Sequence, residues 1–256
     1  MTVMEPKLAE RRKTVSEDRA RKRLKWILVV IAVVAFVVAS MWLIRSPVFS
    51  IRQINVTGAQ NSDPTSTVAS LGVGIGTPTI DVDGSDIEAA LLIDPWVKSV
   101  DVVVSWPGSV AIDVVEYEGV APVGVGDQWV LLSIEGVVLT VVSRPGPQDA
   151  YLTIDQESLT PGEIVDDERI LGALVFLDQI ARGSGVPVQI VADGEGLSAS
   201  AMGHVVRLGR AVDMAQKAIV LETLLDSGLE PGAFIDLIAP LRPAVSNPQP
   251  VVEGEQ

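Results

Sequence analysis

The stretch VKSVDVVVSWPGSVAIDVVEY, residues Val97–Tyr117, decides the fold of the segment in which it lies. Apolar and polar side chains alternate over Val97–Trp106 and again over Val110–Tyr117, and Pro107 and Gly108 stand between the two runs. Such alternation is typical of strands with one buried face, and a Pro-Gly pair is typical of a tight turn. The stretch therefore predicts a β-hairpin.

The residues before the hairpin predict a strand and two short helices, which give the segment the order β-α-α-β-β. Ser62 or Asp63 is expected to cap the first helix, and Ser85-x-x-Glu88 has the spacing of a capping box at the start of the second. The predicted elements are a strand over Val48–Val56, ending at Gly58, and helices over Ser62–Leu71 and Ser85–Leu92.

A second segment, from Gly119 to Val245, predicts strands and two helices, so the fold class is α+β. Asp166 is expected to cap the first of these helices, and Gly183 and Gly228 to end the two. Residues 246–256, rich in Pro and polar side chains, are expected to be disordered. Strands are expected at 129–132, 137–142, 186–192, 197–201, 204–208 and 233–238, and helices at 167–181 and 211–227.

The run WILVVIAVVAFVVASMWLI, residues Trp26–Ile44, holds nineteen residues without a charge. At about 1.5 Å per helical residue it spans the roughly 30 Å apolar core of a bilayer. A cleaved secretory signal is the alternative, but the apolar region of such a signal is usually about 7–15 residues long. We therefore expect a retained transmembrane helix, with Trp26 and Trp42 near its two interfaces.

Charge orients this helix. The first 25 residues hold nine Lys or Arg and four acidic residues, a charge of +5, so residues 26–256 carry −19, given the chain total of −14. Basic flanks stay in the cytoplasm, which predicts a cytoplasmic tail over residues 1–25 and a large part on the outer side of the cell membrane. The charged tail is expected to be disordered, and the acidic outer part argues against nucleic-acid binding.

The residues that common catalytic centres need are missing or lack their spacing. Cysteine is absent, which removes disulfides, thiolate nucleophiles and thiolate metal sites. His204 is the single histidine, and no Gly-x-Ser-x-Gly or Ser-x-x-Lys motif occurs. Asp81–Glu88 has its Gly at the wrong position for a calcium loop, and Gly72–Gly76 lacks the Gly-Lys-Ser/Thr of a phosphate loop. We expect no enzymatic activity, cofactor or metal site, and His204 is expected to be a packing or surface residue.

The order and spacing of several short motifs carry more information than any one of them. They are Ser46-Pro47-Val48-Phe49, Gly76-x-Pro78, Pro95-Trp96-Val97, Trp106-Pro107, Ile134-Glu135-Gly136, Val206-Arg207-Leu208-Gly209, Lys217 and Ile235-Asp236-Leu237. In this arrangement the part after the membrane helix resembles the bacterial cell-division family FtsQ, also called DivIB. The resemblance implies a POTRA domain over residues 47–118 and the family's β domain over residues 119–245.

The sequence departs from the family pattern at two places. The family often has Glu-Arg-x-Pro after the third POTRA strand, where this chain has Glu116-Tyr117-Glu118-Gly119. An Arg commonly follows Asp-Leu in the last strand, where this chain has Ile238, and Arg242 comes four residues later. Partner contacts that depend on these two family arginines are therefore not expected to be the same in this chain.

The resemblance implies a non-enzymatic scaffold at the division septum that supports septal wall synthesis. Its partners would be FtsB- and FtsL-type division proteins, and the FtsB-type partner would add a strand to an edge strand at the end of the β domain. The POTRA domain would serve localisation and contacts with other components of the division machinery, through strand Ser99–Val104 and helix Ser85–Leu92. Carried over position by position, the partner-binding residues are Phe234, Ile235, Asp236, Leu237, Ile238, Ala239, Leu241 and Arg242.

Other interpretations stay open at this point. A membrane-anchored POTRA protein of a transport or secretion assembly is the main alternative, although it would normally need a β-barrel or further spans. An anchored cell-wall enzyme is a third possibility, which the missing nucleophile motifs disfavour. For Ile235 and Leu237, plain core packing is the alternative to partner contact.

Overall fold

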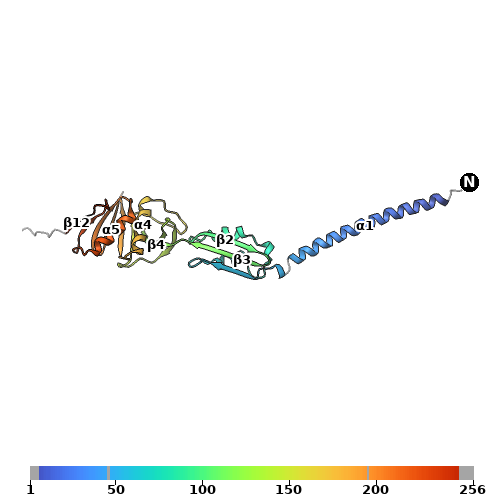
Figure 1. Ribbon diagram of the computed structural model, residues 1–256, viewed down its shortest axis with the longest axis horizontal. Helices are drawn as coiled ribbons and strands as arrows, with labels where there is room; N and C mark the ends of the chain where they lie inside the picture. Colours follow the sequence, from blue (N-terminus) through green and yellow to red (C-terminus); the bar gives the residue numbers. More distant parts are fainter. Residues whose placement is uncertain (1–5, 45–46, 195, 248–256) are drawn as a thin grey trace, which may run out of the picture. The chain divides into compact units, whose positions relative to one another are not determined.

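The computed structural model describes residues 6–44, 47–194 and 196–247. Their strands form two separate sheets, one of three strands and one of nine, and a long helix precedes both in the chain (Figure 1). The predicted α+β class is confirmed, with the β-α-α-β-β order first and a β-rich part after it.

Helix α1 runs from Pro6 to Ile44, and its stretch Leu24–Leu43 is long and apolar enough to cross a membrane. The mean hydropathy of this stretch is 2.7, and none of it is buried against other described residues. The prediction of a disordered basic tail is wrong from Pro6 onward, because the helix begins there. Ala, Arg, Lys and Glu have high helix propensities, and a helix that is already nucleated extends easily through them.

The three-stranded sheet has the order β1-β3-β2, which places the last strand of the segment in the middle. The predicted hairpin is confirmed as β2 and β3, and Asp63 caps the first helix by accepting a hydrogen bond from the backbone N of Ser66 at 3.0 Å. The elements are η1 (Pro47–Phe49), β1 (Gln53–Thr57), α2 (Pro64–Ser70), η2 (Thr79–Asp81), α3 (Gly84–Leu91), β2 (Val97–Ser105) and β3 (Ser109–Glu116).

Strand β1 is shorter than its sequence pattern indicates. Residues Pro47–Phe49 form the 3-10 helix η1, and Ser50 makes only an isolated bridge, so the strand begins at Gln53. Val and Phe favour strands, but Pro47 has no N–H for a ladder. The ring of Phe49 instead packs against Trp106, with the centroids 5.5 Å apart.

Two predicted helix caps are wrong by one or two residues. Asp83 caps α3 in place of the predicted Ser85: its Oδ1 accepts hydrogen bonds from the backbone N and the Oγ of Ser85, at 2.9 and 2.7 Å. Asp167 caps α4 in place of Asp166, and its Oδ1 accepts from the backbone N of Arg169 at 2.8 Å. Neighbouring residues of capping type satisfy the sequence rule equally, and only the backbone conformation selects between them.

The nine-stranded sheet has the order β12-β11-β10-β9-β8-β7-β4-β5-β6 and mixes parallel and antiparallel pairs. The sequence patterns did not predict β4, β7 or β12. Gly and Pro interrupt β4, and the other two are too short for alternation to show. The strands are β4 (Gly119–Val125), β5 (Gln128–Ser133), β6 (Val138–Val142), β7 (Tyr151–Ile154), β8 (Val188–Asp193), β9 (Gly196–Ala201), β10 (His204–Gly209), β11 (Phe234–Asp236) and β12 (Ala244–Ser246).

Helices α4 (Glu168–Arg182) and α5 (Met214–Asp226) pack against each other, and α4 lies along β4, β7, β8 and β9. Strand β10 buries every second side chain in this core: Val206 and Leu208 are buried, whereas Val205 and Arg207 are exposed. Each buried aliphatic side chain stabilises the fold by about 1.5–3 kcal/mol. His204 is buried on the same side as Val206, and its Nδ1 has no hydrogen-bond partner among the described residues.

Candidate partner-binding edge of the nine-stranded sheet

Strand β11 joins the sheet through a β-α-β unit made of β10, α5 and β11. β10 and β11 run parallel, with Arg207 opposite Asp236. Parallel neighbours need a crossover connection, and α5 supplies it. The backbone N of Leu237 donates to the carbonyl of Arg207 at 2.8 Å, which extends the pairing past the end of β11. The position of β11 therefore depends on how β10 and α5 are joined.

Lys217 on α5 fixes that junction. Its side chain is 2% exposed, and its Nζ donates to the carbonyl oxygens of Leu208 and Arg210 at 2.7 and 2.8 Å. Burial lowers the pKa of Lys217, although the charge of Asp213 acts in the opposite direction. The family resemblance included Lys217 but assigned no role to it. The structure shows that it holds the end of β10, where the chain leaves the sheet.

Strand β12 lies outside β11, which corrects the predicted position of the sheet edge. The two strands are antiparallel, with Phe234 opposite Ser246 and Asp236 opposite Ala244. β12 ends the strand order, so its outer side has no neighbouring strand in the described chain. The prediction that the chain ends in an edge strand is confirmed, but the edge is β12 rather than the predicted strand over residues 233–238.

The eight predicted partner-binding residues fall into two groups. Ile235 and Leu237 are fully buried, which agrees with core packing. The other six lie on the outer face of β11 or in the turn that leads to β12: Phe234, Asp236, Ile238, Ala239, Leu241 and Arg242. Binding of a partner by these residues stays a prediction.

The turn between β11 and β12 is held by local contacts. Asp236 Oδ1 accepts from the backbone N of Ile238 at 2.9 Å, and the N of Arg242 donates to the carbonyl of Ala239 at 2.9 Å. Leu241 lies in this turn and is 86% exposed. An exposed large apolar side chain marks an interaction site when other exposed apolar side chains lie next to it.

Exposed apolar side chains flank the edge on both faces of the sheet. Phe234 pairs in register with Val205 on the face away from the helices, and they are 38% and 54% exposed. Val245 lies opposite Ile235, hence on the helix side, and is 39% exposed. Motif reading missed Val245 because it lies beyond the last predicted strand. A strand added to β12 would meet apolar contacts on both of its faces.

Comparison with known proteins agrees with this architecture. The chain combines a helix long and apolar enough to cross a membrane, a β-α-α-β-β segment and a mixed sheet with an open edge. Residues 49–117 match the family model described as POTRA domain, FtsQ-type.

Relatives over most of the chain make the class more specific. Cell division protein FtsQ of Streptomyces venezuelae is 29% identical over 227 residues, which cover 86% of this chain and 83% of that protein. Cell division protein FtsQ of Streptomyces griseus is 27% identical over 206 residues, 77% of this chain and 96% of the relative. The resemblance to FtsQ is confirmed, and the chain is a cell-division protein related to FtsQ.

Proposed function

We propose that this chain is a non-enzymatic scaffold of the division machinery that recruits FtsB- and FtsL-type partners through the β11–β12 edge. In this proposal residues 1–25 lie in the cytoplasm and residues 26–44 span the cell membrane. The POTRA domain (47–118) and the β domain (119–245) lie outside at the septum, where they support wall synthesis.

The observation that carries the proposal is the outermost strand of the nine-stranded sheet. β12 is three residues long, all of them exposed, and it ends the strand order. Such an edge offers unpaired N–H and C=O groups to which another chain can add a strand. Apolar side chains beside it would supply affinity, and the backbone pairing would set the register.

The turn that carries Leu241 is held against the sheet at its start. Gly209 has φ +69°, and a Cβ on it would lie 2.9 Å from Cγ1 of Ile238, so Ile238 packs closely over this glycine. This contact seats the start of the turn while Leu241 stays in solvent. The transport or secretion alternative has less support, because the relatives named above are cell-division proteins.

Proline substitution in β12 tests the strand-addition step. Successive N–H groups of a strand point to opposite edges, so one of the two residues Ala244 and Val245 has its N–H on the outer side of β12. The single variants Ala244→Pro and Val245→Pro are therefore compared, because one of them removes that N–H. We expect at least one of them to weaken binding of an FtsB-type protein about tenfold or more, which corresponds to about 1.4 kcal/mol. Ala244→Ser is the matched control, because it changes a side chain of the same strand, keeps the N–H and leaves the apolar side chains beside the edge in place. Equal binding by both proline variants and the control would contradict strand addition.

A further inference from the structure

A pocket of about 670 Å³ opens on the nine-stranded sheet, over β4, β5, β6 and β7, at the other end of the strand order from β11 and β12. Gly124 lies opposite both Trp129 and Thr153 in the register. Its neighbours Val123 and Val125 are fully buried in the helix-side core, so Gly124 and its register partners face the uncovered side of the sheet. The volume is in the range of about 300–1,000 Å³ that small-ligand sites occupy.

An aromatic pair forms one wall of this pocket. The rings of Trp129 and Tyr151 have centroids 5.2 Å apart and meet edge to face at 86°. A Cβ at Gly124 would lie 2.9–3.1 Å from three successive atoms of the indole ring, so the indole covers the glycine. The absence of a side chain at Gly124 is what lets Trp129 lie across the strand and hold this wall in place.

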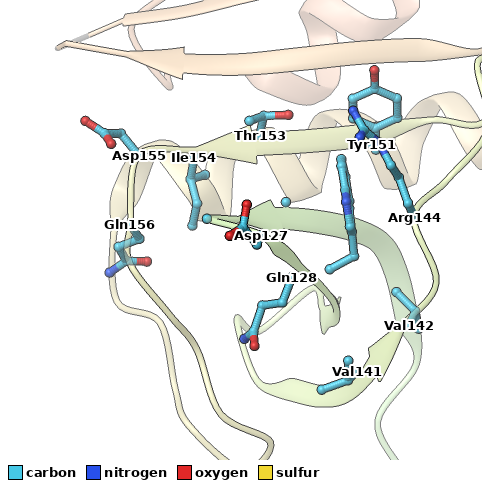
Figure 2. A pocket seen from close by; sticks show the side chains of 13 residues that line it. Asp127, Gln128, Val141, Val142, Arg144, Tyr151, Thr153, Ile154, Asp155 and Gln156 are labelled. Carbon is cyan, nitrogen blue, oxygen red and sulfur yellow. The ribbon is translucent and has the colours of Figure 1, made fainter.

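The charged side chains around the pocket have no structural contact within the described part of the chain. Asp127, Arg144 and Asp155 are exposed and make no hydrogen bond or ion pair within the described part of the chain. Elsewhere in the molecule, aspartates such as Asp83 and Asp167 cap helices. Figure 2 shows Asp155 and Gln156 on one side of the pocket and Arg144 and Tyr151 on the other.

The charges select the kind of ligand. Two carboxylates, Asp127 and Asp155, disfavour a phosphate or another anion, and the guanidinium of Arg144 disfavours a compact cation. An uncharged ligand with many hydroxyl groups can donate to the carboxylates and accept from the guanidinium. It also needs an apolar surface for the aromatic wall. A pyranose sugar has both, since its ring carries hydroxyls at the rim and C–H groups on its faces.

We propose that this pocket is a saccharide-binding site. A sugar ring packs against the wall of Trp129 and Tyr151, its hydroxyls donate to Asp127 and Asp155, and Arg144 donates to a ring or acetamido oxygen. The site is separate from the β11–β12 edge and does not depend on the proposed recruitment of division partners.

The test is titration calorimetry of the full-length protein in lipid nanodiscs, because detergents with sugar headgroups would compete for the site. The probe is the β-1,4-linked trimer of N-acetylglucosamine, which is uncharged and presents hydroxyl and acetamido groups. We expect binding with a Kd of about 1 mM or tighter. Asp127→Asn and Asp155→Asn combined should weaken it about tenfold or more, since hydrogen bonds to charged groups are the strong ones. Asp226→Asn, an exposed aspartate on α5, is the matched control and should leave binding unchanged.

Co-sedimentation with insoluble cell-wall glycan distinguishes a polymeric ligand from a free or terminal saccharide. Binding of the trimer together with co-sedimentation assigns the site to a polymer, and binding of the trimer alone assigns it to a free or terminal saccharide. The absence of heat with 10 mM trimer would overturn the proposal. So would undiminished binding in the double variant, or binding of a lysine-rich peptide in place of the trimer.

Discussion

Glu116, at the end of β3, is the side chain with the most hydrogen bonds to a loop in the described structure. Removing its carboxylate should lower the free energy of unfolding. Its carboxylate accepts from the backbone N of Gln60 at 3.0 Å and from the backbone N and Nδ2 of Asn61 at 3.0 Å. It also accepts from the backbone N and Oγ of Ser62 at 2.8 and 2.5 Å. These bonds tie the loop between β1 and α2 to β3.

The size of the effect follows from the pKa of Glu116. Burial alone would raise this pKa, but the hydrogen bonds from Ser62, Gln60 and Asn61 prevail and lower it from 4.5 to about 2. A difference of this size corresponds to roughly 3 kcal/mol between the two protonation states. Because the carboxylate is only partly buried, solvent screening reduces the expected contribution to about 1–2 kcal/mol.

The sign of the pH dependence is fixed by the lowered pKa. The contribution of Glu116 to the free energy of unfolding is present above pH 4.5 and is lost as the pH falls toward 2. Glu116→Gln should therefore destabilise the protein by about 1–2 kcal/mol at pH 7 and by clearly less at pH 2.5. Urea unfolding at both pH values measures the two differences.

Glu230→Gln is the control, because Glu230 is exposed and its carboxylate makes no hydrogen bond within the described chain; only its backbone carbonyl accepts one, from the N of Ala233. It should change the free energy of unfolding by less than about 0.5 kcal/mol at either pH. A loss below about 0.5 kcal/mol for Glu116→Gln, or a loss that is the same at pH 7 and pH 2.5, would refute the reasoning.

Two further predictions concern stability. Lys217→Met should cost about 2 kcal/mol at pH 7, because the buried carbonyl of Leu208 and the partly buried carbonyl of Arg210 lose their donor. Burial lowers the pKa of Lys217 in the folded protein, so just below pH 10.5 the unfolded chain binds more protons than the folded one. The wild-type free energy of unfolding should therefore rise with pH in this range, and the rise should be absent from the variant. Gly58→Ala should destabilise by more than about 2 kcal/mol, since its φ is +83° and a Cβ would lie 1.9 Å from the carbonyl oxygen of Val114. Gly72→Ala is its control, with φ +75° but nothing within 4 Å, and should cost about 1 kcal/mol in the same urea assay. Equal costs for the two glycines would contradict the steric argument.

The sequence predicted those parts of the fold that rest on local patterns. The β2–β3 hairpin and helix α4 have long periodic runs with clear turn residues, and both were placed within two residues. Strand β12 could not be predicted, because three exposed residues carry no alternation and owe their conformation to pairing with β11. The α1 helix was underestimated for a related reason: composition alone does not show that a membrane helix can extend into a charged tail.

The site was predicted less well than the fold. Motif reading identified the strand and turn over residues 234–242, but not that a further strand covers β11. The saccharide pocket had no sequence signal at all. Its aromatic pair joins Trp129 of β5 to Tyr151 of β7, and β4 lies between these strands in the sheet. A pair of this kind depends on sheet order, which local periodicity does not determine.

Binding of an FtsB-type protein to the full-length chain tests the central claim most directly. Leu241→Glu adds a charge to a side chain that is 86% exposed and so should leave the fold intact, and Ile75→Glu does the same at a site that is 80% exposed and far along the sequence from the edge. We predict that Leu241→Glu weakens binding about tenfold or more, because the edge would have to bury the new charge, and that Ile75→Glu leaves it unchanged. Binding that is equal in the two variants and in the wild-type chain would contradict recruitment through the β11–β12 edge.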